Sequence, residues 1–196
     1  MRASAATDAA ARVRLFVALA LPAATRRSLA GWSSDVLSGD ESLRLVDSAA
    51  LHVTLVFLGW RDEHDVERVA DVVRLASAGR VAAELRPTRL TALPRRQPRV
   101  LAVELEDAEG RAAATQAALS AGLVAAGLHE DERRAFRPHV TVARVRRGGR
   151  PPSGRFPDPP AGPAIADEVV LYRSDLSASG ARYTPLDVVT LTAEGT

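Results

Sequence analysis

The chain has 196 residues, 46% of them hydrophobic, which is enough to bury the core of one domain or of two closely packed lobes. It contains no cysteine, which excludes disulfides and thiolate metal sites and makes a cytoplasmic location the default expectation. The formal net charge is only +2, yet all 26 basic residues are arginine, so every basic surface is built from guanidinium groups.

The composition of the N-terminal residues and the lengths of the apolar runs indicate the domain organisation. Residues 1–12 are rich in alanine and lack periodicity, so we expect a flexible extension there and a single bilobal domain over residues 13–196. No apolar run approaches the roughly 20 residues that a membrane-spanning helix needs. We therefore expect no membrane partner, and we expect a monomer.

In the first half of the chain, apolar runs of strand length alternate with segments of helical periodicity. A proline after the first run suits the first turn of a helix, and glycines close the last run and the last helix. The expected elements are a strand over 15–21, a helix after Pro22, strands over 43–46 and 51–58, and a helix from Asp62 to Gly79.

The second half continues the mixture of helices and strands, with proline and glycine marking the turns. Such a mixed order predicts an α+β fold. The expected elements are strands over 82–90 and 100–105 around a turn at 94–98, a helix over 110–126 with Leu119 and Leu123 inward, a strand over 139–145, a long loop over 148–163, and strands over 164–172 and 182–191 around a turn at 177–180.

The tripeptide His-Val-Thr occurs twice, at residues 52–54 and 139–141, each time in an expected strand. Because side chains alternate between the faces of a strand, each motif places its imidazole and its hydroxyl on one face and its valine on the other. In the first strand the same alternation assigns Phe57 to the apolar face. One buried histidine with one hydrogen bond needs no function. A core, however, has no reason to repeat the same polar pair at two matching strand entrances.

The two histidines are 87 residues apart, and each motif strand follows a helix and one or more further strands. We infer an internal duplication that gives two pseudo-symmetric lobes of antiparallel sheet plus helices, facing each other across a central cleft. A chance repeat within one sheet is the alternative.

Two histidines on opposite sides of one phosphorus atom suit an in-line displacement. One imidazole takes a proton from water while the other delivers a proton to the departing alkoxide, and pKa values of about 6.5 allow both forms near neutrality. Threonine hydroxyls can donate to the non-bridging phosphate oxygens. We expect no cofactor and no metal, because the chain lacks a His-Glu-x-x-His or His-x-His group for a zinc hydrolase.

The segments around both motifs, residues 51–59 and 136–144, are similar to the two signatures of the two-histidine (2H) phosphoesterases. The branch that they resemble most is the LigT-like RNA 2′,3′-cyclic phosphodiesterases, formerly called 2′-5′ RNA ligases, and the likeness extends from Arg14 to Leu191. This resemblance implies metal-independent hydrolysis of a terminal RNA 2′,3′-cyclic phosphate to a 2′-phosphate. The implied partners are RNA 3′ ends, with tRNA-like fragments as one candidate source.

The resemblance also implies roles for single residues. His52 would be the general acid that protonates O3′, His139 the general base that activates water, and Thr54 and Thr141 the phosphate donors. Arg144 matches a family arginine near the phosphate, although strict alternation places it on the opposite face from the second motif. Either the strand bends or bulges near residue 143, or the arginine reaches around the strand end. A plain surface arginine is the other interpretation.

Three alternatives to this function stay open. The substrate could be a small cyclic nucleotide or an ADP-ribose cyclic phosphate, since the motifs contact only the phosphate. The chain could also be a non-catalytic module that binds RNA ends. Arginines cluster within residues 95–99, 133–137 and 144–155, and these clusters are candidate contacts for nucleic-acid phosphates.

Overall fold

The computed structural model describes residues 11–130, 132, 134–152, 154, 156–177 and 180–193. Most of the expected extension therefore lies outside the described residues, and Arg12 already belongs to the first strand. The helices are α1 (Ala23–Leu37), α2 (Val66–Ser77) and α3 (Arg111–Ala125), with 3₁₀ turns at Ser48–Ala50 and Glu63–Asp65. The strands are β1 (Arg12–Ala20), β2 (Leu43–Leu45), β3 (His52–Asp62), β4 (Ala83–Leu93), β5 (Val100–Glu106), β6 (His139–Val145), β7 (Ala164–Ala166), β8 (Glu168–Ser177) and β9 (Gly180–Thr190).

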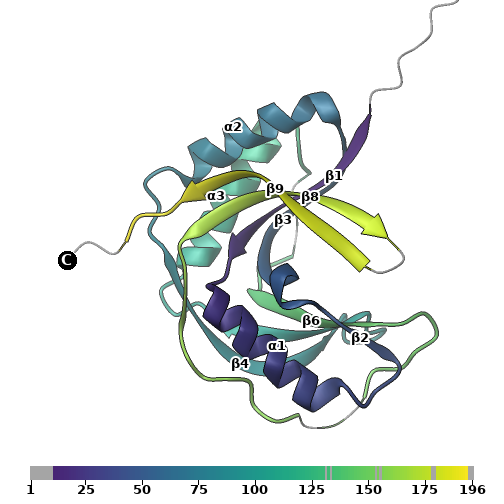
Figure 1. Ribbon diagram of the computed structural model, residues 1–196. Coiled ribbons are helices and arrows are strands. Elements are labelled where there is room, and N and C mark those ends of the chain that lie inside the picture. The colour runs from purple at the N-terminus through teal and green to yellow at the C-terminus, as the bar shows by residue number, and fades with distance from the viewer. Residues whose placement is uncertain are drawn as a thin grey trace, which may run out of the picture.

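These strands form a curled sheet in the order β7-β4-β5-β6-β3-β1-β8-β9, and β2 pairs with β6 beside this path. Every pairing between them is antiparallel. One half of the sheet consists of β3, β1, β8 and β9, and the other of β6, β5, β4 and β7 (Figure 1). The two halves join between β3 and β6, where Val53 pairs with Val140 and both valines are fully buried.

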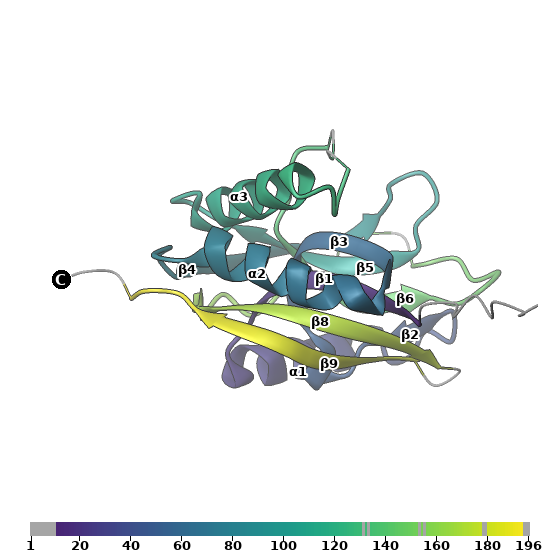
Figure 2. The same ribbon diagram turned by 90° about the horizontal axis from the view of Figure 1, so that it is seen from above.

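Helices cover the curled sheet on both sides. Figure 2 shows α3 and α1 on opposite sides of the strands, with α2 in front of them. α2 contacts α3, β8 and β9, α3 also contacts β3 and β4, and α1 contacts β2 and β6. The expected α+β architecture of two lobes of antiparallel sheet plus helices is thus confirmed. No helix in the described part of the chain is long and apolar enough to cross a membrane.

Helix positions agree well with the periodicity of the sequence. Leu119 and Leu123 are fully buried on the inner side of α3, as predicted. The helix expected from Asp62 begins instead with a 3₁₀ turn, so that α2 starts at Val66, and the side chain of Asp62 makes no capping hydrogen bond. The glycine that ends this helix, Gly79, has a φ of 68°, a conformation that favours glycine.

Two strand predictions were wrong. β3 does not stop at Gly59 but continues to Asp62, because Gly59 adopts a φ of 71° and an irregularity in the pairing with β1 carries the strand through. The single strand expected over 164–172 is two strands: β7 pairs with β4 and β8 pairs with β1, so the chain crosses from one half of the sheet to the other at residue 167. The turn expected at 177–180 lies partly outside the described residues.

Candidate active site

A bulge follows the threonine of the first motif. Thr54 pairs with Ala18, but the next pair joins Val56 to Val17, so Leu55 is an extra residue in β3. Leu55 and Val56 are both buried, whereas Phe57 is 48% exposed. The prediction that Phe57 faces the core is therefore wrong, because the bulge reverses the alternation and returns this ring to the face of the motif.

A second bulge follows the threonine of the second motif. Thr141 pairs with Ala102 and Ala143 pairs with Leu101, which leaves Val142 as the extra residue of β6. Val142 and Ala143 are both fully buried. Arg144 consequently returns to the face of the motif, by the kind of bulge that the sequence left open as one possibility.

All five of the predicted site residues meet at one small cavity of about 50 Å³. A water molecule occupies roughly 30 Å³ in the liquid, so this space accepts a group of a few atoms and the rest of a nucleotide must lie outside it. The lining residues are His52, Thr54, His139, Thr141, Arg144, Tyr183, Val46 and Ala50.

The strand register explains how the two motifs meet. β3 and β6 run antiparallel with Val53 opposite Val140, and the residues on either side of this pair point to the other face of the sheet. His52 therefore lies across from Thr141, and Thr54 lies across from His139. The two imidazoles enter the cavity from neighbouring strands. Near each imidazole lie the hydroxyl of its own motif and the hydroxyl of the other motif.

Both imidazoles are held in the same way by the main chain. The Nδ1 of His52 lies 2.8 Å from the carbonyl oxygen of Ala50, and the Nδ1 of His139 lies 2.8 Å from the carbonyl oxygen of Arg137. Since a carbonyl oxygen can only accept, each Nδ1 must carry the proton. Nε2 is then the atom of each ring that exchanges protons. These carbonyl partners could not be predicted from the sequence, because every residue has a carbonyl group.

The surroundings of His52 favour its neutral form. Burial lowers the pKa of His52 from 6.5 to about 4; the Ala50 carbonyl opposes this shift, and the charges of Arg144 and His139 add to it. Its Nε2 lies 3.1 Å from Oγ1 of Thr54, which can donate to the neutral ring. At pH 7 the unliganded site therefore holds His52 without its second proton.

Three aromatic rings surround His52. Its ring centroid lies 4.8 Å from that of Phe16, 5.2 Å from that of Tyr183 in an edge-to-face contact, and 6.3 Å from that of Tyr172. Tyr183 also accepts a long hydrogen bond of 3.5 Å from Arg144. The sequence did not indicate that Phe16 or Tyr183 would lie beside this histidine. The one available signal was that the chain contains only two tyrosines, and nothing in their spacing connects them to a histidine.

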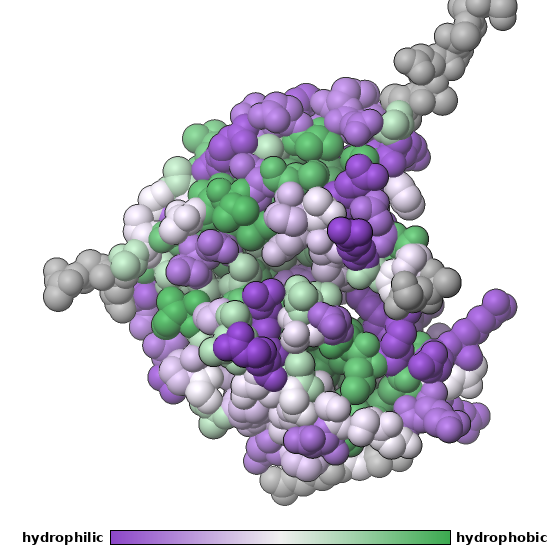
Figure 3. All heavy atoms as spheres, viewed as in Figure 1, coloured by the Kyte–Doolittle hydropathy of each residue, from purple (hydrophilic) through white to green (hydrophobic). Residues whose placement is uncertain are grey.

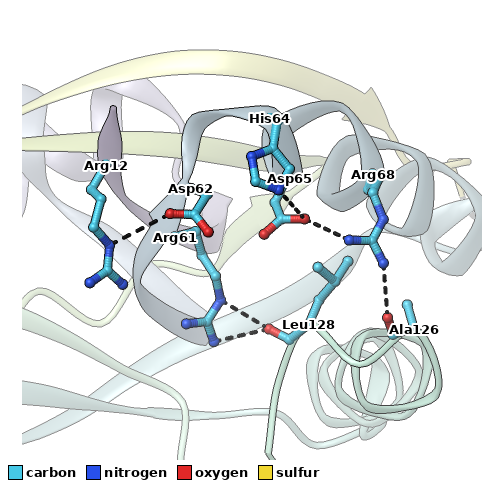
Figure 4. Close-up of polar contacts among 8 residues, drawn as sticks. All are labelled: Arg12, Arg61, Asp62, His64, Asp65, Arg68, Ala126 and Leu128. Atoms are coloured by element: carbon cyan, nitrogen blue, oxygen red, sulfur yellow. Dashed lines mark hydrogen bonds and ion pairs between the residues drawn. The ribbon is translucent and has the colours of Figure 1, made fainter. Parts of the chain in front are cut away.

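Among the described residues, side chains that could ligate a metal gather at one place, where Asp62, His64 and Asp65 bring their ligand atoms within 4.8 Å of one another. Figure 4 shows that both carboxylates already have cationic partners: Arg12 lies 3.9 Å from Asp62, and Arg68 lies 2.6 Å from Asp65. The group lies at the far end of β3 from His52, roughly 30 Å away by the rise of a strand. It therefore contributes nothing to the cavity between the motifs.

The chain is similar in sequence to known proteins. A family model described as the 2′-5′ RNA ligase superfamily matches residues 25–150. An RNA 2′,3′-cyclic phosphodiesterase from Methanothermobacter thermautotrophicus is 29% identical over 187 residues, which cover 92% of this chain and all of that protein.

Solved structures resemble the fold over 92 to 93% of the chain. Escherichia coli LigT without ligand superposes with a TM-score of 0.75 at 25% identity, covering 92% of this chain and 98% of LigT. The same protein in complex with 3′-AMP gives a TM-score of 0.75 at 26% identity, with 93% and 99% covered. A protein from Thermus thermophilus gives 0.76 at 27% identity, with 93% and 100% covered.

Proposed function

The chain belongs to the 2′-5′ RNA ligase superfamily, and from this premise we propose that it hydrolyses the terminal 2′,3′-cyclic phosphate of RNA to a 2′-phosphomonoester by metal-independent catalysis with two histidines. The observation that carries the proposal is the meeting of both motifs at one cavity of about 50 Å³, with each Nδ1 held by a carbonyl so that both Nε2 atoms are left for proton transfer. The name of the relative from Methanothermobacter thermautotrophicus supports the same activity.

In the proposed reaction, the Nε2 of His139 takes a proton from water as the water oxygen bonds to phosphorus. The P–O3′ bond breaks, and the Nε2 of His52 gives its proton to the departing O3′. The hydroxyls of Thr54 and Thr141 and the guanidinium of Arg144 donate to the non-bridging oxygens, where negative charge develops. After product release, solvent removes the proton from His139 and returns one to His52.

The acid role of His52 requires a proton that the unliganded site disfavours. A bound phosphate offsets the charge of Arg144, one of the causes of the low pKa, and accepts a hydrogen bond from protonated Nε2. We therefore expect inorganic phosphate to raise the pKa of His52 from about 4 toward neutrality. Between these two values the ring is neutral in the free protein and protonated in the complex, so phosphate binding takes up a proton in this pH range.

Nuclear magnetic resonance of the imidazole nitrogens, titrated with and without phosphate, measures this shift directly. The exposed His64 provides an internal reference and should not respond to phosphate. A His52 ring that stays neutral at pH 6 with phosphate bound would reverse the assignment, making His52 the base and His139 the acid.

The reaction is also expected to proceed undiminished in excess chelator, because the proposed groups are side chains alone. The substrate for this assay is an oligonucleotide ending in a 2′,3′-cyclic phosphate, and the product isomer is identified by chromatography against 2′- and 3′-phosphate standards. We expect only the 2′-phosphate. Loss of turnover in chelator would refute the metal-independent mechanism, and a 3′-phosphate product would show that O2′ rather than O3′ leaves.

A further inference from the structure

Three adjoining cavities lead away from the histidines on the side of Arg144. This arginine lines both the cavity of the motifs and a neighbouring one of about 320 Å³. The second cavity shares residues 145–147 with a groove of about 1060 Å³ between the β4–β5 loop and the loop that follows β6. In Figure 3 hydrophilic side chains project from the edge of the molecule where β6 ends and this loop turns.

Among the described residues, arginine is the only charged residue type in the lining of the second cavity and of the groove. None of these guanidinium groups forms an ion pair with a described residue, in contrast to Arg68, Arg74 and Arg86 elsewhere on the surface. Uncompensated positive charge in a concave surface attracts anions. The arginines concerned are Arg44, Arg96, Arg99, Arg144, Arg146, Arg147 and Arg150.

Two of these arginines stand directly opposite each other across neighbouring strands. Arg44 of β2 pairs with Arg144 of β6, and both line the second cavity. Like charges in this arrangement destabilise a sheet, and an anion bound between them would remove the penalty. Arg144 thus lines the motif cavity on one side and, together with Arg44, the second cavity on the other, so the two cavities adjoin at this residue.

We propose that these cavities bind the backbone phosphates of the nucleotides upstream of the reacting end, so that a single-stranded RNA 3′ segment, rather than a mononucleotide, is the preferred substrate. This inference rests on the proposed function, which puts the terminal cyclic phosphate between the motifs. Arg144 then lies between the reacting phosphate and the next one, and the groove takes the strand beyond. We call the row of cavities the upstream track.

The test compares two substrates on a charge-reversed protein. Arg99→Glu and Arg147→Glu together change two exposed side chains of the track for which the structure records no hydrogen bond. The substrates are a 2′,3′-cyclic mononucleotide and a single-stranded decanucleotide with the same 3′ end. We expect kcat/KM for the decanucleotide to fall at least tenfold, and the slope of log Kd against log salt to flatten by roughly 1.4 for two lost phosphate contacts. Mononucleotide turnover should stay within twofold.

The matched control is Arg68→Glu with Arg86→Glu, which makes the same change in net charge on α2 and β4. An equal loss of kcat/KM for the decanucleotide in the control would overturn the proposed binding of RNA along the upstream track. An unchanged kcat/KM for the decanucleotide in the track variant would overturn it as well. If the wild-type protein opens neither substrate, the proposed function fails. The binding arm, with an unreactive decanucleotide ending in a 3′-phosphate, then still decides whether the track holds RNA.

Discussion

Replacement of either His52 or His139 by alanine is expected to lower kcat for cyclic-phosphate opening by about 10²- to 10⁴-fold. Each imidazole moves a proton that water cannot move efficiently, and a positioned general acid or base contributes on that order. The two act in one step, so the double variant should be little worse than the worse single variant. Steady-state kinetics on a cyclic mononucleotide, together with product identification, measures both effects.

His64→Ala is the matched control, because this histidine is exposed and sits at the far end of β3. His52 also packs against Phe16 and Tyr183, so thermal unfolding of the His52 variant must show a folded protein before its kinetics are interpreted. A folded variant of either motif histidine that retains more than a tenth of the wild-type kcat would reject two-histidine catalysis.

The motifs themselves could be read from the sequence because the relevant geometry spans only three residues. Over that distance a strand alternates reliably, so the sharing of a face by His52 and Thr54, and by His139 and Thr141, is confirmed by the cavity that they line together. The repetition predicted that the two motifs face each other, but it did not predict that their strands pair within one sheet. What the sequence could not show is which residue on each strand stands opposite which, because that register depends on the whole sheet.

Whether a bulge follows each motif could not be decided from the sequence, for a physical reason. Leu55-Val56 and Val142-Ala143 are apolar pairs, and either member of each pair could fill a core position. Alternation therefore places residues after the motif correctly only if no residue is inserted, and the composition of the strand does not reveal an insertion. An inserted residue that alternation does not take into account explains why Phe57 was assigned to the core. It also explains why the face on which Arg144 lies stayed ambiguous.

The two bulges also make the site asymmetric in a useful way. Phe57 and Arg144 each stand five residues after the histidine of their motif, and each returns to the motif face because of a bulge. The first copy thus presents a half-exposed aromatic ring, beneath the guanidinium of Arg14 at 4.6 Å, where the second copy presents a cation. Among the described residues, Arg144 is the only arginine that lines the cavity with the two histidines, and its charge is one of the causes that lower the pKa of His52.

Removal of that cation by Arg144→Leu should therefore produce two effects of different kind. We expect kcat/KM for a cyclic mononucleotide to fall by about 10²- to 10³-fold, since a donor to the developing phosphate charge is lost. We also expect the pKa of His52 in the unliganded protein to rise above about 4, because the positive charge of Arg144 is one of the causes that lower it. Kinetics and imidazole titration measure the two effects independently.

Arg144→Lys should restore part of the activity, because a point charge remains but the paired donors of the guanidinium do not. Arg147→Leu removes a neighbouring arginine that lies outside the motif cavity and should leave mononucleotide turnover unchanged. A loss of activity with no change in the pKa of His52 would mean that Arg144 acts on the substrate without reaching the histidine. Unchanged kcat/KM would remove Arg144 from the phosphate site altogether, and with it the junction on which the upstream track depends.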